Sequence, residues 1–242
     1  MVVGIDVACG QDTHEVRHGR HSDNQSDNRR GGDCRKCADA VGNNDEPIEV
    51  FLVYSLRFID EMYIANELRK KNIAEYLLYM WQVEDTIRAF DCSLTRIKRE
   101  YVERFEYSEE QKEDEVDWFG NLIRMMNQEG CREQGHLQIN KVTMQTLIDL
   151  HNQLLESTKF PFYNAEYYKV LPFIVELRSR GANKEENEIE TCFNSLYGLM
   201  LLRLQKKDIT PDTAHAVKEI STFIGMLSDY YKKDKEEGLK FE

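Results

Sequence analysis

The chain has 242 residues, of which 41% are hydrophobic and 31% are charged, and its formal net charge at pH 7 is −12. A chain of this length can bury one sizeable core and is too short for two large domains, so we expect a single domain. The negative charge repels phosphate backbones and anionic lipid headgroups, so neither nucleic acid nor a membrane surface is an expected partner.

Residues 1–61 differ in composition from the rest of the chain. They hold six of the thirteen glycines, no aromatic residue before Phe51, and six arginines against one lysine. Without a repeating apolar pattern, residues 1–47 cannot offset the cost of ordering the backbone, about 1–2 kcal/mol per residue. We predict either a disordered extension or a start codon assigned upstream of the true one at Met62, and we favour the second. A peptide from residues 1–50 in mass spectra of the native protein would contradict the second explanation.

Neither a signal peptide nor a membrane span is expected. Asp6 follows only a few apolar residues, and no basic leader precedes it. The densest apolar run, Leu196 to Leu202, is far shorter than the roughly eighteen residues that a spanning helix needs. The six cysteines do not suggest a disulfide scaffold. These features predict a cytoplasmic protein with reduced thiols.

From Met62 onward, apolar residues recur at helical spacing. A first long helix is expected to begin near Ile64, and a second to follow Ser93. Ser108 and Gln111 have the spacing of a capping box and predict the start of a third helix, which Gly130 ends. The apolar stripes of the first two helices are Ile73, Tyr76, Met80, Val83, Ile87 and Phe90, then Leu94, Ile97, Tyr101 and Phe105.

Four more helices are expected after Gly135. A fourth covers about 140–156, and Pro161 closes it. Asn164 is the expected N-cap of a fifth helix, in which Pro172 should kink the axis and after which Gly181 is the C-cap. The fifth helix carries Tyr168, Leu171, Val175 and Arg178, the sixth covers about 185–206, and the seventh begins at Thr210 and Pro211.

The pattern as a whole predicts an all-α fold. No segment from Met62 onward alternates apolar and polar residues over the length of a strand, and no internal repeat is visible. We therefore expect a single-domain bundle of about six to seven helices over residues 62–242, preceded by the extension 1–61.

Two groups of residues resemble metal sites, and we favour chance for both. Cys34 and Cys37 have the C-x2-C spacing of a zinc site, with His14, His18 and His21 nearby, but the segment lacks aromatic residues to pack around a metal. Glu133 with His136 and Asp212 with His215 have the acid-x-x-His spacing of di-metal bundles. About one such pair arises by accident in this composition, and no matching bridging glutamates appear. We predict no metal and no cofactor.

A polar cluster on the first helix is the remaining candidate site. Gln82, Glu84, Asp85 and Arg88 lie beside Trp81. A solvent-exposed Glu84–Arg88 pair at i,i+4 is the favoured interpretation. The alternative is a buried carboxylate and guanidinium that form a ligand site together with His136. His151 is expected to be a hydrogen-bonded histidine at the edge of the core.

Residues 62–235 resemble a family of uncharacterised all-helical proteins from Bacteroides-like bacteria, known only as a domain of unknown function. The resemblance rests on Tyr63 to Arg88 (YIANELRKKNIAEYLLYMWQVEDTIR), Gly135 to Gln138 (GHLQ), Tyr167 to Arg178 (YYKVLPFIVELR) and Glu188 to Lys206 (EIETCFNSLYGLMLLRLQK). It covers none of residues 1–61. It implies no activity and no site residues.

The expected function is that of a cytoplasmic helical interaction or scaffold protein without catalytic activity, whose partner is a second copy or another protein. No phosphate-binding glycine loop, nucleophile elbow or HExxH motif is present, so no catalytic residues are predicted. The alternative is an enzyme or small-ligand protein with a polar pocket between helices, formed by Glu84, Asp85, Arg88 and His136. A metal-carrying bundle is the third possibility.

Overall fold

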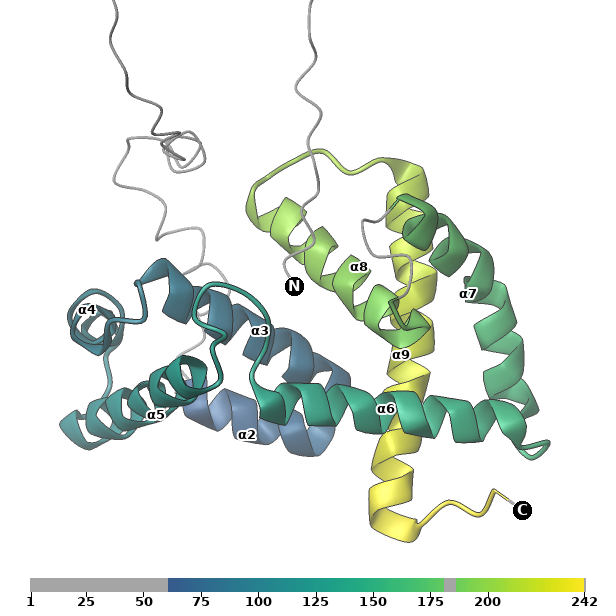
Figure 1. Cartoon of the computed structure of the whole chain (residues 1–242), viewed down its shortest axis with the longest axis horizontal. Coiled ribbons are helices and arrows are strands. Elements are labelled where there is room, and N and C mark those ends of the chain that lie inside the picture. Colours follow the sequence, from purple (N-terminus) through teal and green to yellow (C-terminus); the bar gives the residue numbers. More distant parts are fainter. Residues whose placement is uncertain (1–60, 181–185, 242) are drawn as a thin grey trace, which may run out of the picture.

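The computed structural model describes residues 61–180 and 186–241, which form α-helices, one short 3-10 helix and no strand (Figure 1). The predicted all-α fold is confirmed. The predicted extension up to residue 60, its histidines and cysteines, and Gly181 lie outside the described residues. The elements are α2 (Glu61–Lys71), α3 (Ile73–Ala89), α4 (Leu94–Glu100), η2 (Val102–Arg104), α5 (Glu109–Gln128), α6 (Gln138–Glu156), α7 (Pro161–Arg180), α8 (Glu188–Leu204) and α9 (Pro211–Glu237).

The expected first helix is in fact two helices that meet at Asn72. The backbone of Asn72 is extended, and its side chain accepts hydrogen bonds from Ala74 N (3.1 Å) and Glu75 N (3.2 Å), which makes it the N-cap of α3. Ser228 of α9 donates to the same oxygen over 2.8 Å and so fixes the corner. Apolar spacing alone did not reveal this break, because the stripe that defined the helix begins at Ile73, directly after it.

Several predicted boundaries are confirmed by their capping contacts. Ser108 and Gln111 form the capping box of α5, and Thr210 caps α9 with Pro211 in its first turn. Gly130 follows α5 with a φ of 68°, and Cys131 N donates to Met126 O over 3.0 Å. That bond and the left-handed glycine are those of a Schellman motif, which ends the helix.

The predicted start of the fifth helix is wrong. Helix α7 begins at Pro161, and Asn164 lies inside its first turn and donates its N–H to Phe160 O. Proline is favoured at the first helical position because the missing N–H has no partner there in any helix. The helix continues through Pro172 without interruption.

Helix α9 lies against α3, α6, α7 and α8 and crosses the molecule between its two sides (Figure 1). In this view, α2, α3, α4, α5 and α8 lie to the left of α9 and α7 lies to its right, while α6 runs across from one side to the other. The core includes the fully buried rings of Phe119, Tyr163, Phe193 and Phe223. Burial of a side chain of this size contributes about 1.5–3 kcal/mol.

No helix among the described residues has both the length and the apolar character needed to cross a lipid bilayer.

Candidate functional site

The carboxylate of Glu84 joins α3 to the start of α6. Glu84 is fully buried, with 0% of its surface exposed. One oxygen accepts hydrogen bonds from Leu137 N (2.9 Å) and Asn140 Nδ2 (2.7 Å), and the other lies 2.6 Å from Nδ1 of His136. The structure therefore brings Glu84 and His136 together although 52 positions separate them in the sequence.

Asp85 and Arg88 form the second half of the cluster. Arg88 Nη1 lies 2.7 Å from Asp85 Oδ1, while its Nη2 donates to the carbonyl oxygens of Cys131 (3.1 Å) and Gly135. The hydroxyl of Tyr197 in α8 donates to Asp85 Oδ2 over 2.5 Å. Burial, followed by the negative charge of Asp85, raises the pKa of Tyr197 well above its ordinary value.

The favoured interpretation of a solvent-exposed Glu84–Arg88 pair is wrong. Arg88 pairs with Asp85 at i,i+3, and Glu84 points inward to the N-terminus of α6. The reason is positional: Glu84 is on the buried side of α3 with Trp81, whereas Asp85 and Arg88 are at its edge. The ring of His136 stacks on Trp81, with centroids 4.2 Å apart and planes 16° from parallel.

The cluster uses almost all of its polar groups internally. Among its buried side-chain atoms, Arg88 Nε and Asn140 Oδ1 lack a hydrogen-bond partner. The arrangement fastens α3 to α6 and to the loop before α6, and it leaves few donors and acceptors for a ligand. His215, the histidine of the second acid-x-x-His pair (Asp212 with His215), is on the surface of α9. Within residues 61–180 and 186–241, no group of three or more potential ligand side chains is arranged to hold a metal ion.

A second polar region surrounds His151 of α6, which is hydrogen-bonded as expected but is buried, with 3% of its surface exposed. Its Nδ1 lies 2.7 Å from the hydroxyl of Tyr163, and burial lowers its pKa to about 4, so the ring is neutral at pH 7. The hydroxyl of Tyr167 donates to Glu188 over 2.7 Å, and Arg178 Nη1 lies 3.7 Å from the same carboxylate. His151, Tyr167, Arg178 and Glu188 border a hollow of about 460 Å³ between α6, α7 and the start of α8. The sequence contains no signal for the neighbours of His151 or for the hollow, because these residues are on other helices.

Helix α7 has an apolar face that no described helix covers. We call Phe162, Ala165, Tyr168, Pro172 and Val175 the α7 outer face, since all five are exposed, with 79% of Phe162, 67% of Tyr168 and 56% of Val175 accessible. The helix is apolar on its inner side as well, where Tyr163, Tyr167, Val170 and Ile174 are buried. Tyr168 and Val175, which the sequence analysis used to define this helix, are thus on its outside.

The model of one protein family matches the chain over residues 62–238, and that family is described as a domain of unknown function, DUF4924. The chain belongs to this family. The match covers all but the first residue of α2 and continues to the end of α9. Comparison with curated proteins and with solved structures gave no match.

Proposed function

We propose that this DUF4924 protein is a non-catalytic helical interaction protein that self-associates through the α7 outer face. The observation that supports the proposal is the exposure of large apolar side chains along α7, which lies at the edge of the molecule (Figure 1). Contiguous exposed apolar surface on a helix is typical of protein–protein contact sites. A cytoplasmic location and an origin in Bacteroides-like bacteria belong to the same proposal.

The spacing of the α7 outer face suits pairing with another helix. Ala165, Tyr168, Pro172 and Val175 alternate in steps of three and four, the spacing of the a and d positions that meet in helix pairs. The buried side of α7 already packs against α8 and α9. A second helix would therefore have to come from outside the described chain.

A second copy is the proposed occupant, because the face is self-complementary. When two α7 helices run antiparallel about a two-fold axis at the level of Val170, Ala165 lies opposite Val175 and Tyr168 lies opposite Pro172. Each contact then occurs twice, as in any isologous interface, and each small or flat side chain meets a larger one. Lys169 beside the stripe does not oppose this pairing, since its charge is already compensated by Glu219 at 2.5 Å.

The size of the face predicts a weak dimer. A helix of 20 residues is about 30 Å long and about 10 Å wide. That face alone supplies less than the roughly 800 Å² per partner of a standard stable interface. We expect a concentration-dependent dimer with a dissociation constant in the micromolar range, about 10⁻⁶ to 10⁻⁴ M.

Sedimentation equilibrium of Val175→Glu tests the proposal against a matched control. Val142 in α6 is as exposed as Val175, at 55% against 56%, but lies outside the α7 outer face. We expect the wild type and Val142→Glu to dimerise equally and Val175→Glu to stay monomeric, because a carboxylate buried at the interface is unpaired. A wild type that stays monomeric at all concentrations, or equal behaviour of the two variants, would contradict it.

The hollow beside His151 favours a second candidate function, the binding of a small polar ligand. Arg178 supplies a positive charge and Glu186 a negative one at its edge. A zwitterion such as a free amino acid presents the complementary pair of charges. Thermal-shift measurements with a panel of free amino acids test this second function. If none of the amino acids raises the melting temperature of the protein, the proposal is wrong.

A further inference from the structure

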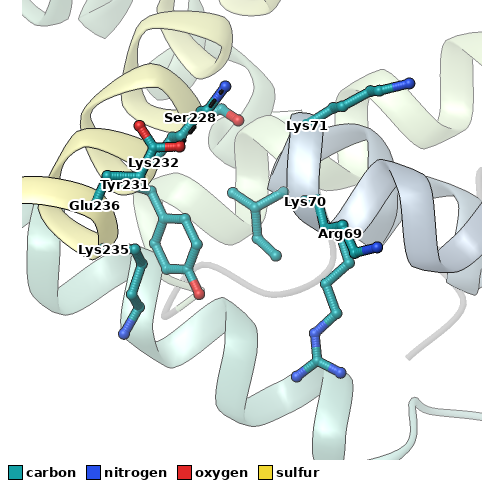
Figure 2. A pocket seen from close by; sticks show the side chains of 9 residues that line it. Arg69, Lys70, Lys71, Ser228, Tyr231, Lys232, Lys235 and Glu236 are labelled. Carbon is teal, nitrogen blue, oxygen red and sulfur yellow. Dashed lines mark ion pairs between the residues drawn. The ribbon is translucent and has the colours of Figure 1, made fainter.

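The ends of α2 and α9 enclose a basic groove of about 310 Å³ (Figure 2). We call it the α2–α9 groove. Six of its nine lining residues are charged, and five of these are basic: Arg69, Lys70, Lys71, Lys232 and Lys235, against the single acidic residue Glu236. A local excess of four positive charges stands out in a chain whose net charge is −12.

Helix electrostatics explains only part of this arrangement. Basic residues in the last turns of α2 and α9 interact favourably with the negative ends of both helix dipoles. That effect accounts for cations at each helix end separately. It does not require the two ends to converge on one hollow, where the like charges repel each other.

The cations of the groove differ in how they are already paired. Lys70 and Lys71 share the carboxylate of Glu67, at 3.7 and 3.0 Å. Arg69 and Lys235 have no ion-pair partner within the described ranges, and each lies near an aromatic ring instead. Arg69 and Lys235 are therefore the two groove cations most available to an anion.

These two cations lie on either side of a hydroxyl. Figure 2 shows the ring of Tyr231 between Lys235 and Arg69, with its hydroxyl on the side toward which both cations extend, while Lys71 points the other way. Guanidinium, ammonium and phenol groups are all hydrogen-bond donors. A cluster of donors with two full charges matches the oxygens of a phosphate group.

We propose that the α2–α9 groove binds the phosphate groups of a small phosphorylated molecule, with Arg69, Tyr231 and Lys235 as its contacts. The volume is at the lower end of the roughly 300–1,000 Å³ of small-ligand sites. A long polyanion fits less well, because the strongly acidic remainder of the surface repels nucleic acid and anionic membranes beyond the groove. This site is separate from the α7 outer face, so either proposal can fail without the other.

Calorimetric titration of the full chain with inorganic tripolyphosphate tests the proposal. We expect one site that weakens with salt. The double variant Arg69→Glu/Lys235→Glu should weaken binding about tenfold or more, since it replaces two charge-assisted donors. Tyr231→Phe should weaken it about fivefold through the loss of one hydrogen bond. All the altered side chains are at the surface or partly exposed, so the fold should persist.

The matched control is Lys98→Glu/Lys207→Glu, which lowers the net charge by the same amount at two exposed lysines outside the groove. It should bind tripolyphosphate as the wild type does. No binding by the wild type, or the same loss in both double variants, overturns the proposal. Cosedimentation with phosphatidylserine vesicles that is lost in Arg69→Glu/Lys235→Glu, without tripolyphosphate binding, would overturn it in favour of a membrane surface.

Discussion

At the scale of single residues, His151 is a neutral imidazole held inside the protein. Three aromatic rings surround it, those of Tyr163, Tyr167 and Phe223, with ring centroids 5.2–5.9 Å away. Burial lowers its pKa to about 4, and the negative charge of Glu188 only partly opposes that effect. Protonation therefore works against the folded state.

The pH dependence of stability follows from that shift. The pKa of His151 is lower in the folded chain than in the unfolded chain, so stability is fully present above about pH 6.5 and falls as the pH drops to about 4. The loss should approach about 3 kcal/mol. Urea unfolding of the wild type and of His151→Gln between pH 7 and pH 4 measures this loss. The quantity to compare is the difference between the two free energies of unfolding at each pH.

His215→Gln is the control for this measurement. His215 is on the surface of α9, with 64% of its side chain exposed. Its variant should follow the wild-type pH profile. Parallel profiles of the wild type and His151→Gln would show that His151 does not couple folding to pH.

At the scale of elements, α6 depends on other helices for its N-cap. Its N-cap residue is Leu137, which has no side-chain acceptor. Glutamates of two other helices supply the missing hydrogen-bond acceptors. Glu84 of α3 accepts from Leu137 N, and Glu129 at the end of α5 accepts from Gln138 N over 2.6 Å. Both carboxylates also interact favourably with the positive end of the helix dipole.

Glu84→Ala should therefore be strongly destabilising. The variant leaves the buried amide of Leu137 and the side chain of Asn140 without their acceptor, and it removes the partner of His136. Loss of one member of a buried polar cluster costs about 3–5 kcal/mol. Thermal or urea unfolding measures the loss.

Glu113→Ala in α5 is the matched control for Glu84→Ala, because Glu113 is exposed. It should change the free energy of unfolding by less than about 0.5 kcal/mol. If Glu84→Ala lowers the free energy of unfolding by as little as Glu113→Ala does, then Glu84 does not hold the N-terminus of α6.

Helical boundaries were predictable where a residue carries its own capping chemistry. Ser108, Gly130 and Thr210 act within one turn of their own position, so the sequence contains the whole signal. Asn72 also caps a helix, but apolar spacing masked it. On α7, apolar residues occur on both sides, so periodicity alone did not distinguish the buried side from the outer face.

At the scale of the whole molecule, the all-α fold class was predictable from the sequence. The polar cluster around Glu84 was predictable only in part. The sequence showed Glu84, Asp85 and Arg88 beside Trp81, and the alternative ligand site grouped His136 with them. The actual pairings depend on packing between distant segments: Asp85 and Tyr197 are 112 positions apart. The α2–α9 groove joins the first and last described helices and was invisible in the sequence for the same reason.

The central place of α9 has a consequence for biosynthesis. The ribosome completes α3, α6, α7 and α8 before α9 exists, yet each of these helices packs against it. Their apolar surfaces stay incompletely covered until α9 has left the exit tunnel. Final packing must then follow the emergence of α9, and the nascent chain is most vulnerable to aggregation just before it.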